Sequence, residues 1–121
     1  MQNKKSSRGM MGENAAAEYY QGCGYTIVAR NYRTRQGEID LIIANNGLLV
    51  FAEVKARSEG SIAMPREWVD ARKQQRIVLA AKAYLQKYEL SEPLMRFDVV
   101  EVYFEKDGKT KINCIENAFS L

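Results

Sequence analysis

Charged side chains in two neighbouring expected strands have types and a spacing that could support chemistry on a phosphate. Residues 37–44 and 48–57 both have strand-like patterns, and the side chains of a strand alternate between its two faces. In the second strand this alternation places Glu53 and Lys55 on the same face. In the first strand it places Asp40 on one face and the apolar residues on the other. The apolar residues expected to share those opposite faces are Ile39, Leu41 and Ile43 in the first strand and Val50, Ala52 and Val54 in the second.

Asp40 and Glu53 would repel one another in so apolar a setting, and an uncompensated buried charge costs several kcal/mol. A divalent cation between them would remove that cost. Two carboxylates with water molecules and a backbone carbonyl suit Mg²⁺, or Mn²⁺ in its place. Lys55 would stand beside the cation, where its ammonium group can orient a water molecule or stabilise charge on a phosphate. These three residues are therefore predicted to be catalytic.

The same charges fit a second interpretation, a ladder of ion pairs on a solvated sheet face. In that arrangement Glu38 or Asp40 would pair with Lys55, and Glu53 would face Arg57. Spacing alone leaves both interpretations open.

Two further residues are candidates from helical positions. Glu13 lies near the start of the first expected helix, where a carboxylate also suits the positive end of the helix dipole. Lys73 lies one turn before Ile77, on the apolar side of the second helix, so it could reach the sheet or run along the helix surface to solvent.

Composition excludes several classes of mechanism. The 121 residues include no histidine, so histidine-based acid–base catalysis and histidine-ligated zinc are ruled out. Cys23 and Cys114 have no metal or disulfide spacing, which favours a reducing compartment and a cytoplasmic location. Neither a signal peptide nor a membrane span is expected.

The net charge of +3 permits a polyanionic partner without requiring one. Arg30, Arg33 and Arg35 are close together with Tyr32 among them, and with Lys73 they are the expected contacts to a nucleic acid. Each basic group could equally be a solvated face.

The pattern along the chain predicts one domain over residues 9–121 behind a disordered basic arm, residues 1–8. Its order is a helix, a three-strand antiparallel meander, a helix and two strands. We therefore expect an α/β fold with a mixed central sheet flanked by helices. The expected helices are residues 12–21 and 69–88, the strands are 25–32, 37–44, 48–57, 94–105 and 110–116, a hairpin turn falls at 45–47, and a loop falls at 58–65.

Several segments together resemble the bacterial YraN family of small, largely uncharacterised proteins. They are Gly12-Glu13, residues 30–33, Gly37 to Ile42, Phe51 to Arg57, residues 69–73, Arg96 to Asp98 and residues 116–119. That family is similar to the restriction-endonuclease-like superfamily, and especially to the archaeal Holliday-junction resolvases. The resemblance implies a restriction-endonuclease-like core in which Glu13, Asp40 and Glu53 bind metal and Lys55 is the catalytic lysine. It therefore adds Glu13 to the residues predicted to be catalytic. It also implies branched DNA as substrate and a homodimer.

Three hypotheses follow for the structure to address. The chain could be a metal-dependent endonuclease acting on DNA, a nucleic-acid-binding module with a nuclease fold that is inactive alone or needs a partner, or a small structural domain with a charged sheet face.

Overall fold

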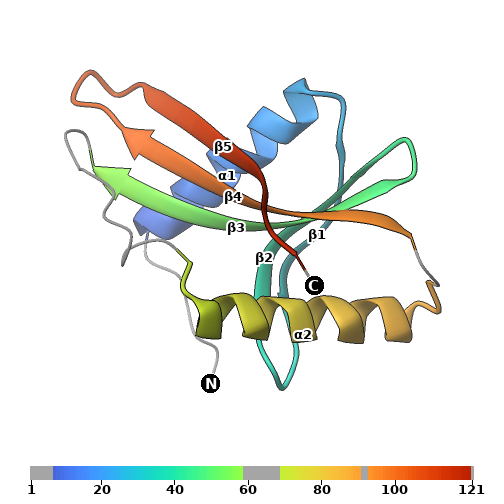
Figure 1. The fold of residues 1–121 in the computed structure, drawn as a ribbon. Coiled ribbons are helices and arrows are strands. Elements are labelled where there is room, and N and C mark those ends of the chain that lie inside the picture. The colour runs from blue at the N-terminus through green and yellow to red at the C-terminus, as the bar shows by residue number, and fades with distance from the viewer. Residues whose placement is uncertain (1–6, 59–68, 91–92, 121) are drawn as a thin grey trace.

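The computed structural model describes residues 7–58, 69–90 and 93–120, which form a mixed sheet with a helix on each side (Figure 1). The expected α/β class and the expected order of elements are both confirmed. In chain order the elements are α1 (Ser7–Gly22), β1 (Thr26–Arg33), β2 (Glu38–Asn45), β3 (Leu48–Ser58), α2 (Ala71–Lys87), β4 (Leu94–Phe104) and β5 (Thr110–Phe119).

The five strands lie side by side in their order along the chain, from β1 to β5. Neighbouring strands are antiparallel except β3 and β4, which pair in parallel from Leu48↔Leu94 to Ser58↔Phe104. Parallel neighbours need a crossover between them, and α2 is the helix in that connection. The meander of β1, β2 and β3 is therefore joined to a second antiparallel pair through α2.

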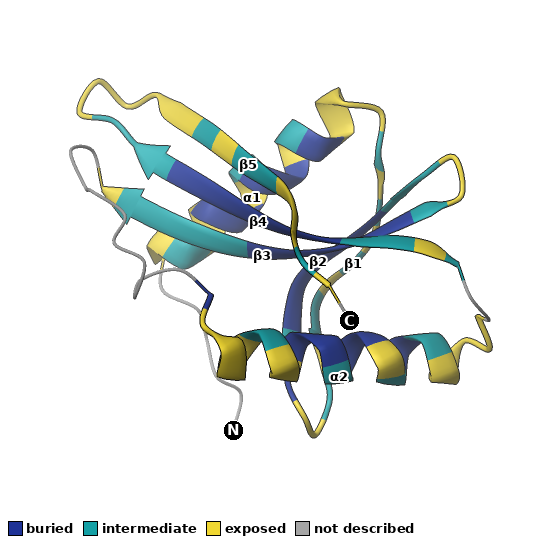
Figure 2. Cartoon of the chain, in the orientation of Figure 1, coloured by how far each residue is buried: buried dark blue, intermediate teal, exposed yellow. Residues whose placement is uncertain are grey.

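The two helices bury opposite faces of the sheet (Figure 2). Ala16 and Tyr20 of α1 pack with alternate residues of the central strands, including Leu41. Ile77 and Tyr84 of α2 pack with the other set, which includes Phe51, Phe97 and Phe119. Neither helix in the described part of the chain is long and apolar enough to cross a membrane.

A two-residue turn joins β2 to β3, as expected from the Asn45-Asn46-Gly47 sequence. Asn46 and Gly47 have positive φ angles of 49° and 82°. Asparagine and glycine tolerate this region, and two positive φ angles in succession are typical of the type I′ turn that matches strand twist. The turn therefore fixes the register in which Leu41 lies opposite Ala52.

Helix α1 begins earlier than the expected residue 12. Residues 1–6 of the expected arm lie outside the described part of the chain, but Ser7 and Arg8 form the start of α1. Arg8 donates a hydrogen bond to Ser58 at the end of β3 and lies over the Phe104 ring. These contacts between elements stabilise an extra helical turn. Of the expected loop 58–65, Ser58 ends β3 and the rest lies outside the described residues.

One predicted alternation is wrong at the start of β2. Leu41 and Ile43 face α1 as a pair, but Ile39 packs in the α2 cluster beside Ile42. The pairing of β2 with β3 ends at Leu41. Beyond it, the Asp40 carboxylate accepts a hydrogen bond from the main-chain amide of Val54. The strands separate at this point, so the regular alternation does not extend through Asp40.

A buried polar network at the other side of the sheet joins α1, β4 and β5. Asp98 has no exposed surface and accepts hydrogen bonds from Tyr20 Oη (2.8 Å), from Arg96 Nε (2.8 Å) and from the main-chain N of Asn117 (3.1 Å). A second nitrogen of Arg96 bonds both Asp98 (2.8 Å) and the Tyr25 hydroxyl (3.1 Å). Burial, followed by the charge of Asp98, raises the pKa of Tyr20, so its hydroxyl stays protonated and donates.

Candidate active site

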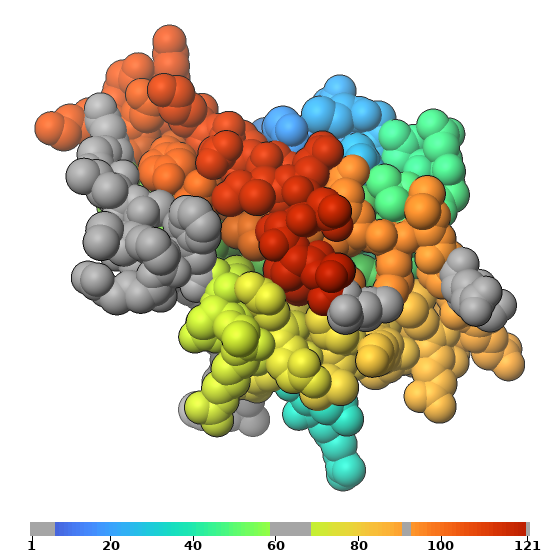
Figure 3. Space-filling view, viewed as in Figure 1, coloured from blue at the N-terminus to red at the C-terminus, as the bar shows by residue number. Residues whose placement is uncertain are grey.

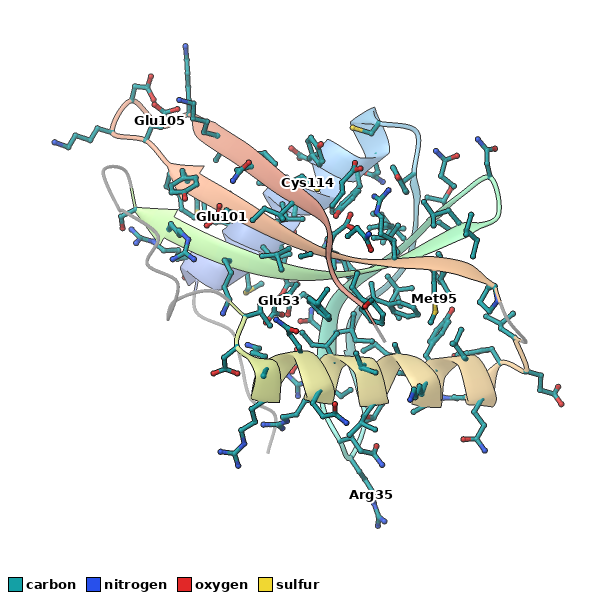
Figure 4. All side chains as sticks on the ribbon, viewed as in Figure 1. Arg35, Glu53, Met95, Glu101, Glu105 and Cys114 are labelled. Carbon is teal, nitrogen blue, oxygen red and sulfur yellow. The ribbon has the colours of Figure 1, made fainter. Side chains whose placement is uncertain are left out.

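A cleft of ≈ 680 Å³ separates β2 and β3 from the first turns of α2. It brings together three of the four residues predicted to be catalytic, Asp40, Glu53 and Lys55. Charged side chains from both sides dominate its lining: Glu38, Asp40, Glu53 and Asp70 are acidic, and Lys55, Arg72, Lys73 and Arg76 are basic. Figure 4 shows Glu53 between the sheet and the start of α2.

Asp40 is held at the point where β2 and β3 separate. Its side chain is only 6% exposed, and its Oδ2 accepts a hydrogen bond of 2.8 Å from the Val54 amide. The register of the β2–β3 pair would otherwise set Val54 opposite Ile39. The carboxylate thus replaces a main-chain partner, which positions it beside the neighbouring residue Glu53.

Glu53 is 4% exposed and contacts Asp40 and Lys73, which have opposite effects on its pKa. Burial is the largest cause that raises its pKa to about 8, followed by the hydrogen bond and the negative charge of Asp40. Lys73 acts in the other direction, with its Nζ 2.7 Å from Glu53 Oε2. Two neighbouring buried carboxylates in an open cleft form a donor set suited to a hard divalent cation.

Lys55 follows Glu53 by two residues and lies on the same face of β3. Its side chain is half-buried, and burial together with the charge of Lys73 lowers the pKa of its ammonium group. Glu53 and Asp40 oppose this effect. A lysine so placed can donate hydrogen bonds to an anionic oxygen in the cleft.

Glu53 and Arg57 each pair with a residue other than the one the solvated-ladder interpretation expects. Glu53 pairs with Lys73 of α2, and Arg57 pairs with the buried Glu101 of β4 at 2.9 Å. Asp40 and Glu53 are both buried, whereas a solvated ladder would expose them.

Glu13 is not brought to the other carboxylates. It is 2% exposed on α1, where its Oε1 accepts a hydrogen bond of 3.0 Å from Asn31 and lies 3.9 Å from an Arg30 nitrogen. Over residues 7–58, 69–90 and 93–120, no three acidic or cysteine side chains gather into a group that could hold a metal ion. Asp40 and Glu53 therefore form a two-carboxylate set in this structure.

The expected basic segment is divided between the two sides of the molecule. Arg30 turns to α1 and donates a hydrogen bond of 2.6 Å to Asn14. Arg33 pairs with Glu38 at 3.3 Å, next to the cleft. Arg35 is exposed in the turn between β1 and β2. Lys73 reaches the sheet, which was one of its two expected positions.

Comparison with known proteins assigns the family. The model of the uncharacterised protein family UPF0102 matches residues 12–102, a span that contains all the candidate site residues. The chain belongs to UPF0102. This result confirms the expected membership of a family of uncharacterised bacterial proteins.

Curated UPF0102 relatives match along nearly the whole chain. A UPF0102 protein of Desulforapulum autotrophicum is 45% identical over 119 residues, which are 98% of each chain. One from Symbiobacterium thermophilum is 48% identical over 111 residues, 92% of this chain and 94% of the relative. One from Acetivibrio thermocellus is 43% identical over 122 residues, 97% of this chain and 94% of the relative.

The cleft of this UPF0102 chain also contains basic residues that were not predicted to belong to the site. Arg72 and Arg76 line the cleft from exposed positions on α2. They are four residues apart, so the helical period places them on one side of the helix. That four-residue spacing is compatible with a binding surface, but a solvated helix face has the same spacing. Only the position of α2 over the sheet shows that these two arginines line the cleft.

Arg76 also fastens the β1–β2 turn to α2. Its Nε donates a hydrogen bond of 3.1 Å to the Gln36 carbonyl. Gly37 packs so closely that a Cβ there would lie 2.6 Å from the Arg76 carbonyl oxygen. Within the turn, Thr34 Oγ1 accepts hydrogen bonds of 3.1 Å from the amides of Gln36 and Gly37. The turn is therefore held in one position against the rim of the cleft.

Gly37→Ala is expected to lower the free energy of unfolding by about 1–3 kcal/mol, because overpacking a close backbone contact forces the turn away from α2. Chemical denaturation of the variant and the wild-type UPF0102 protein measures the difference. Gly22→Ala is the matched control, since a Cβ at Gly22 meets nothing within 4 Å and the change should stay below about 1 kcal/mol. Equal stability of Gly37→Ala and wild type would contradict this account of the turn.

Proposed function

We propose that this UPF0102 protein is a metal-dependent endonuclease that hydrolyses phosphodiester bonds of DNA. The observation that carries the proposal is the meeting of buried Asp40 and Glu53 with Lys55 in one open cleft. Buried acids with perturbed proton affinity in a cleft are typical of catalytic sites. The basic residues on the α2 side supply the charge needed to attract a polyanion into it.

Asp40 and Glu53 are the residues that would hold Mg²⁺ or Mn²⁺. Their oxygens are hard ligands, and Mg²⁺ is commonly held by only one or two carboxylates with several water molecules. When bound, such a cation supplies a Lewis acid for a phosphoryl oxygen and a more acidic water molecule. Glu13, which the resemblance adds to this set, would have to leave Asn31 to take part.

The chain's own cationic groups have separate tasks in this proposal. Lys55 donates to the attacking water molecule or to an oxygen of the reacting phosphate, where negative charge develops. Lys73 balances the charge of Glu53 and, from its half-exposed position, can also contact a phosphate at the mouth of the cleft. Arg72 and Arg76 attract neighbouring phosphates of the same backbone.

Branched DNA is the finer substrate proposal, and it comes from the resemblance to junction resolvases. A homodimer, which the same resemblance implies, would provide one cleft for each of two strands.

A cleavage assay tests the function directly. The purified protein is incubated with end-labelled duplex, single-stranded and four-way-junction DNA, with Mg²⁺, with Mn²⁺ and with a chelator. Metal-dependent cleavage of at least one substrate is the expected result, together with Mn²⁺ binding detected by titration calorimetry. Binding without cleavage on all substrates would instead favour the binding module, and absence of both DNA and Mn²⁺ binding would leave only the structural domain.

A further inference from the structure

The turn between β1 and β2 extends past α2 and carries an exposed arginine at its tip. Arg35 points away from the body of the molecule (Figure 4), and the space-filling view shows the turn projecting beyond the helix (Figure 3). Long flexible turns lose much entropy on binding, but this one is already held by Thr34 and by the contact of Gly37 with Arg76. Because the turn is already ordered, Arg35 can bind an anion with a smaller loss of backbone entropy.

The turn continues a row of basic residues that starts inside the cleft. Arg72 and Arg76 are one helical turn apart, about 6 Å at the Cβ atoms. Arg76 contacts Gln36, the residue after Arg35 in the chain. Arg33, near the base of the turn, faces Glu38 instead and does not extend the row outward. The row therefore runs from the mouth of the cleft along α2 to the tip of the turn.

The chemistry of this surface fits a phosphate backbone better than exposed bases. Single-stranded nucleic acids are generally bound by aromatic rings on which the bases stack. Among the described residues, those that line the cleft include no aromatic side chain. Guanidinium groups spaced along a helix and a constrained turn instead match the regularly spaced phosphates of a duplex.

The geometry also sets a minimum distance between the reacting position and the tip. Asp40 of β2 lies three residues beyond Gly37, at the base of the turn, which corresponds to about 10 Å along the strand. At 3.4 Å per base pair this is about three base pairs. A duplex with one phosphate in the cleft would therefore present further phosphates to Arg76 and Arg35.

We propose that Arg72, Arg76 and Arg35 form a track for the backbone of duplex DNA, with the β1–β2 turn as a rigid arm that contacts the duplex about three base pairs or more from the cleft. This inference deepens the proposed function and rests on it, because it takes the cleft as the place where the phosphate reacts. It makes double-stranded DNA, or a double-stranded arm of a branched molecule, the substrate class.

The experiment measures binding without metal, so that no cleavage is needed. Fluorescence anisotropy gives the affinity for a 20-base-pair duplex and for one of its strands over a series of salt concentrations. Arg35→Gln and Arg72→Gln each remove one charge from the track but keep a long polar side chain. Lys82→Gln is the matched control, because Lys82 is exposed on the same helix about 120° around its axis from Arg76, six residues further along the chain and therefore further from the cleft.

Each track variant should bind the duplex more weakly and lower the slope of log affinity against log salt by about 0.9, the value for one phosphate contact. Lys82→Gln should keep the wild-type slope, and wild type should prefer duplex to single strand. Wild-type slopes for both track variants, or the same affinity for single strand and duplex, would overturn the inference even if the protein cleaves DNA. A lowered slope in a protein that never cleaves would overturn the proposed function instead.

Discussion

Asp40→Asn and Glu53→Gln should each lower DNA cleavage by at least about 100-fold, because each removes one of the two carboxylates proposed to hold the catalytic cation. Mn²⁺ binding measured by calorimetry should weaken in parallel. DNA binding without metal should persist or tighten, since each change removes negative charge near the phosphates. Cleavage, metal affinity and DNA affinity are therefore measured on the same preparations.

Lys55→Ala distinguishes the role of the lysine from the role of the two carboxylates. Cleavage should fall as far, but Mn²⁺ should still bind, since an ammonium group donates hydrogen bonds and does not ligate a metal. Glu18→Gln is the carboxylate control, because Glu18 is exposed on α1, the helix that packs on the opposite face of the sheet from α2, and this variant should cleave as wild type does. If wild type cleaves and all three cleft variants match it, the active-site assignment is wrong.

Asp98→Ala should lower the free energy of unfolding by about 3–5 kcal/mol, the usual loss when one member of a buried ion pair is removed. The change would leave the Arg96 guanidinium and the Tyr20 hydroxyl without the carboxylate that both contact. It would also release the main-chain amide of Asn117 near the end of β5. Chemical denaturation followed by circular dichroism measures the effect.

Glu116→Ala is the control for this second prediction. Glu116 also contacts Arg96, at 3.5 Å, but its side chain is 59% exposed, and exposed pairs contribute about 0–1 kcal/mol. Tyr20→Phe provides a milder test that should still fold, with an expected loss of about 1–3 kcal/mol for the hydrogen bond that the Tyr20 hydroxyl donates to the buried carboxylate. An Asp98→Ala protein within 1 kcal/mol of wild type would show that the network contributes little to stability.

Local patterns in the sequence were enough to predict the elements and the strand face that carries part of the candidate site. Strand and helix periods depend on neighbouring residues in the chain, so the order of elements from α1 to β5 was predicted correctly. The Asn46-Gly47 turn followed from backbone preferences of those two residues alone. Glu53 and Lys55 were correctly placed on one face of β3, because that strand keeps its alternation.

Contacts between distant residues decided the rest. Ile39 turned to the α2 side because Asp40 bonds Val54 across the opening between β2 and β3, a contact that depends on strand register and not on strand period. The choice of Glu53 as partner for Lys73 depends on where α2 crosses the sheet.

The sequence by itself thus determined which charged residues have types and a spacing that could act on a phosphate, and which elements carry them. The tertiary structure decided which of these residues meet. It brought Asp40, Glu53 and Lys55 into one cleft, whereas Glu13 of α1 is hydrogen-bonded to Asn31 of β1. It also placed Arg72 and Arg76 of α2 beside the β1–β2 turn. The physical reason is that periodicity sets the direction of a side chain from its own element, whereas burial, charge pairing and close packing depend on the elements folded against it.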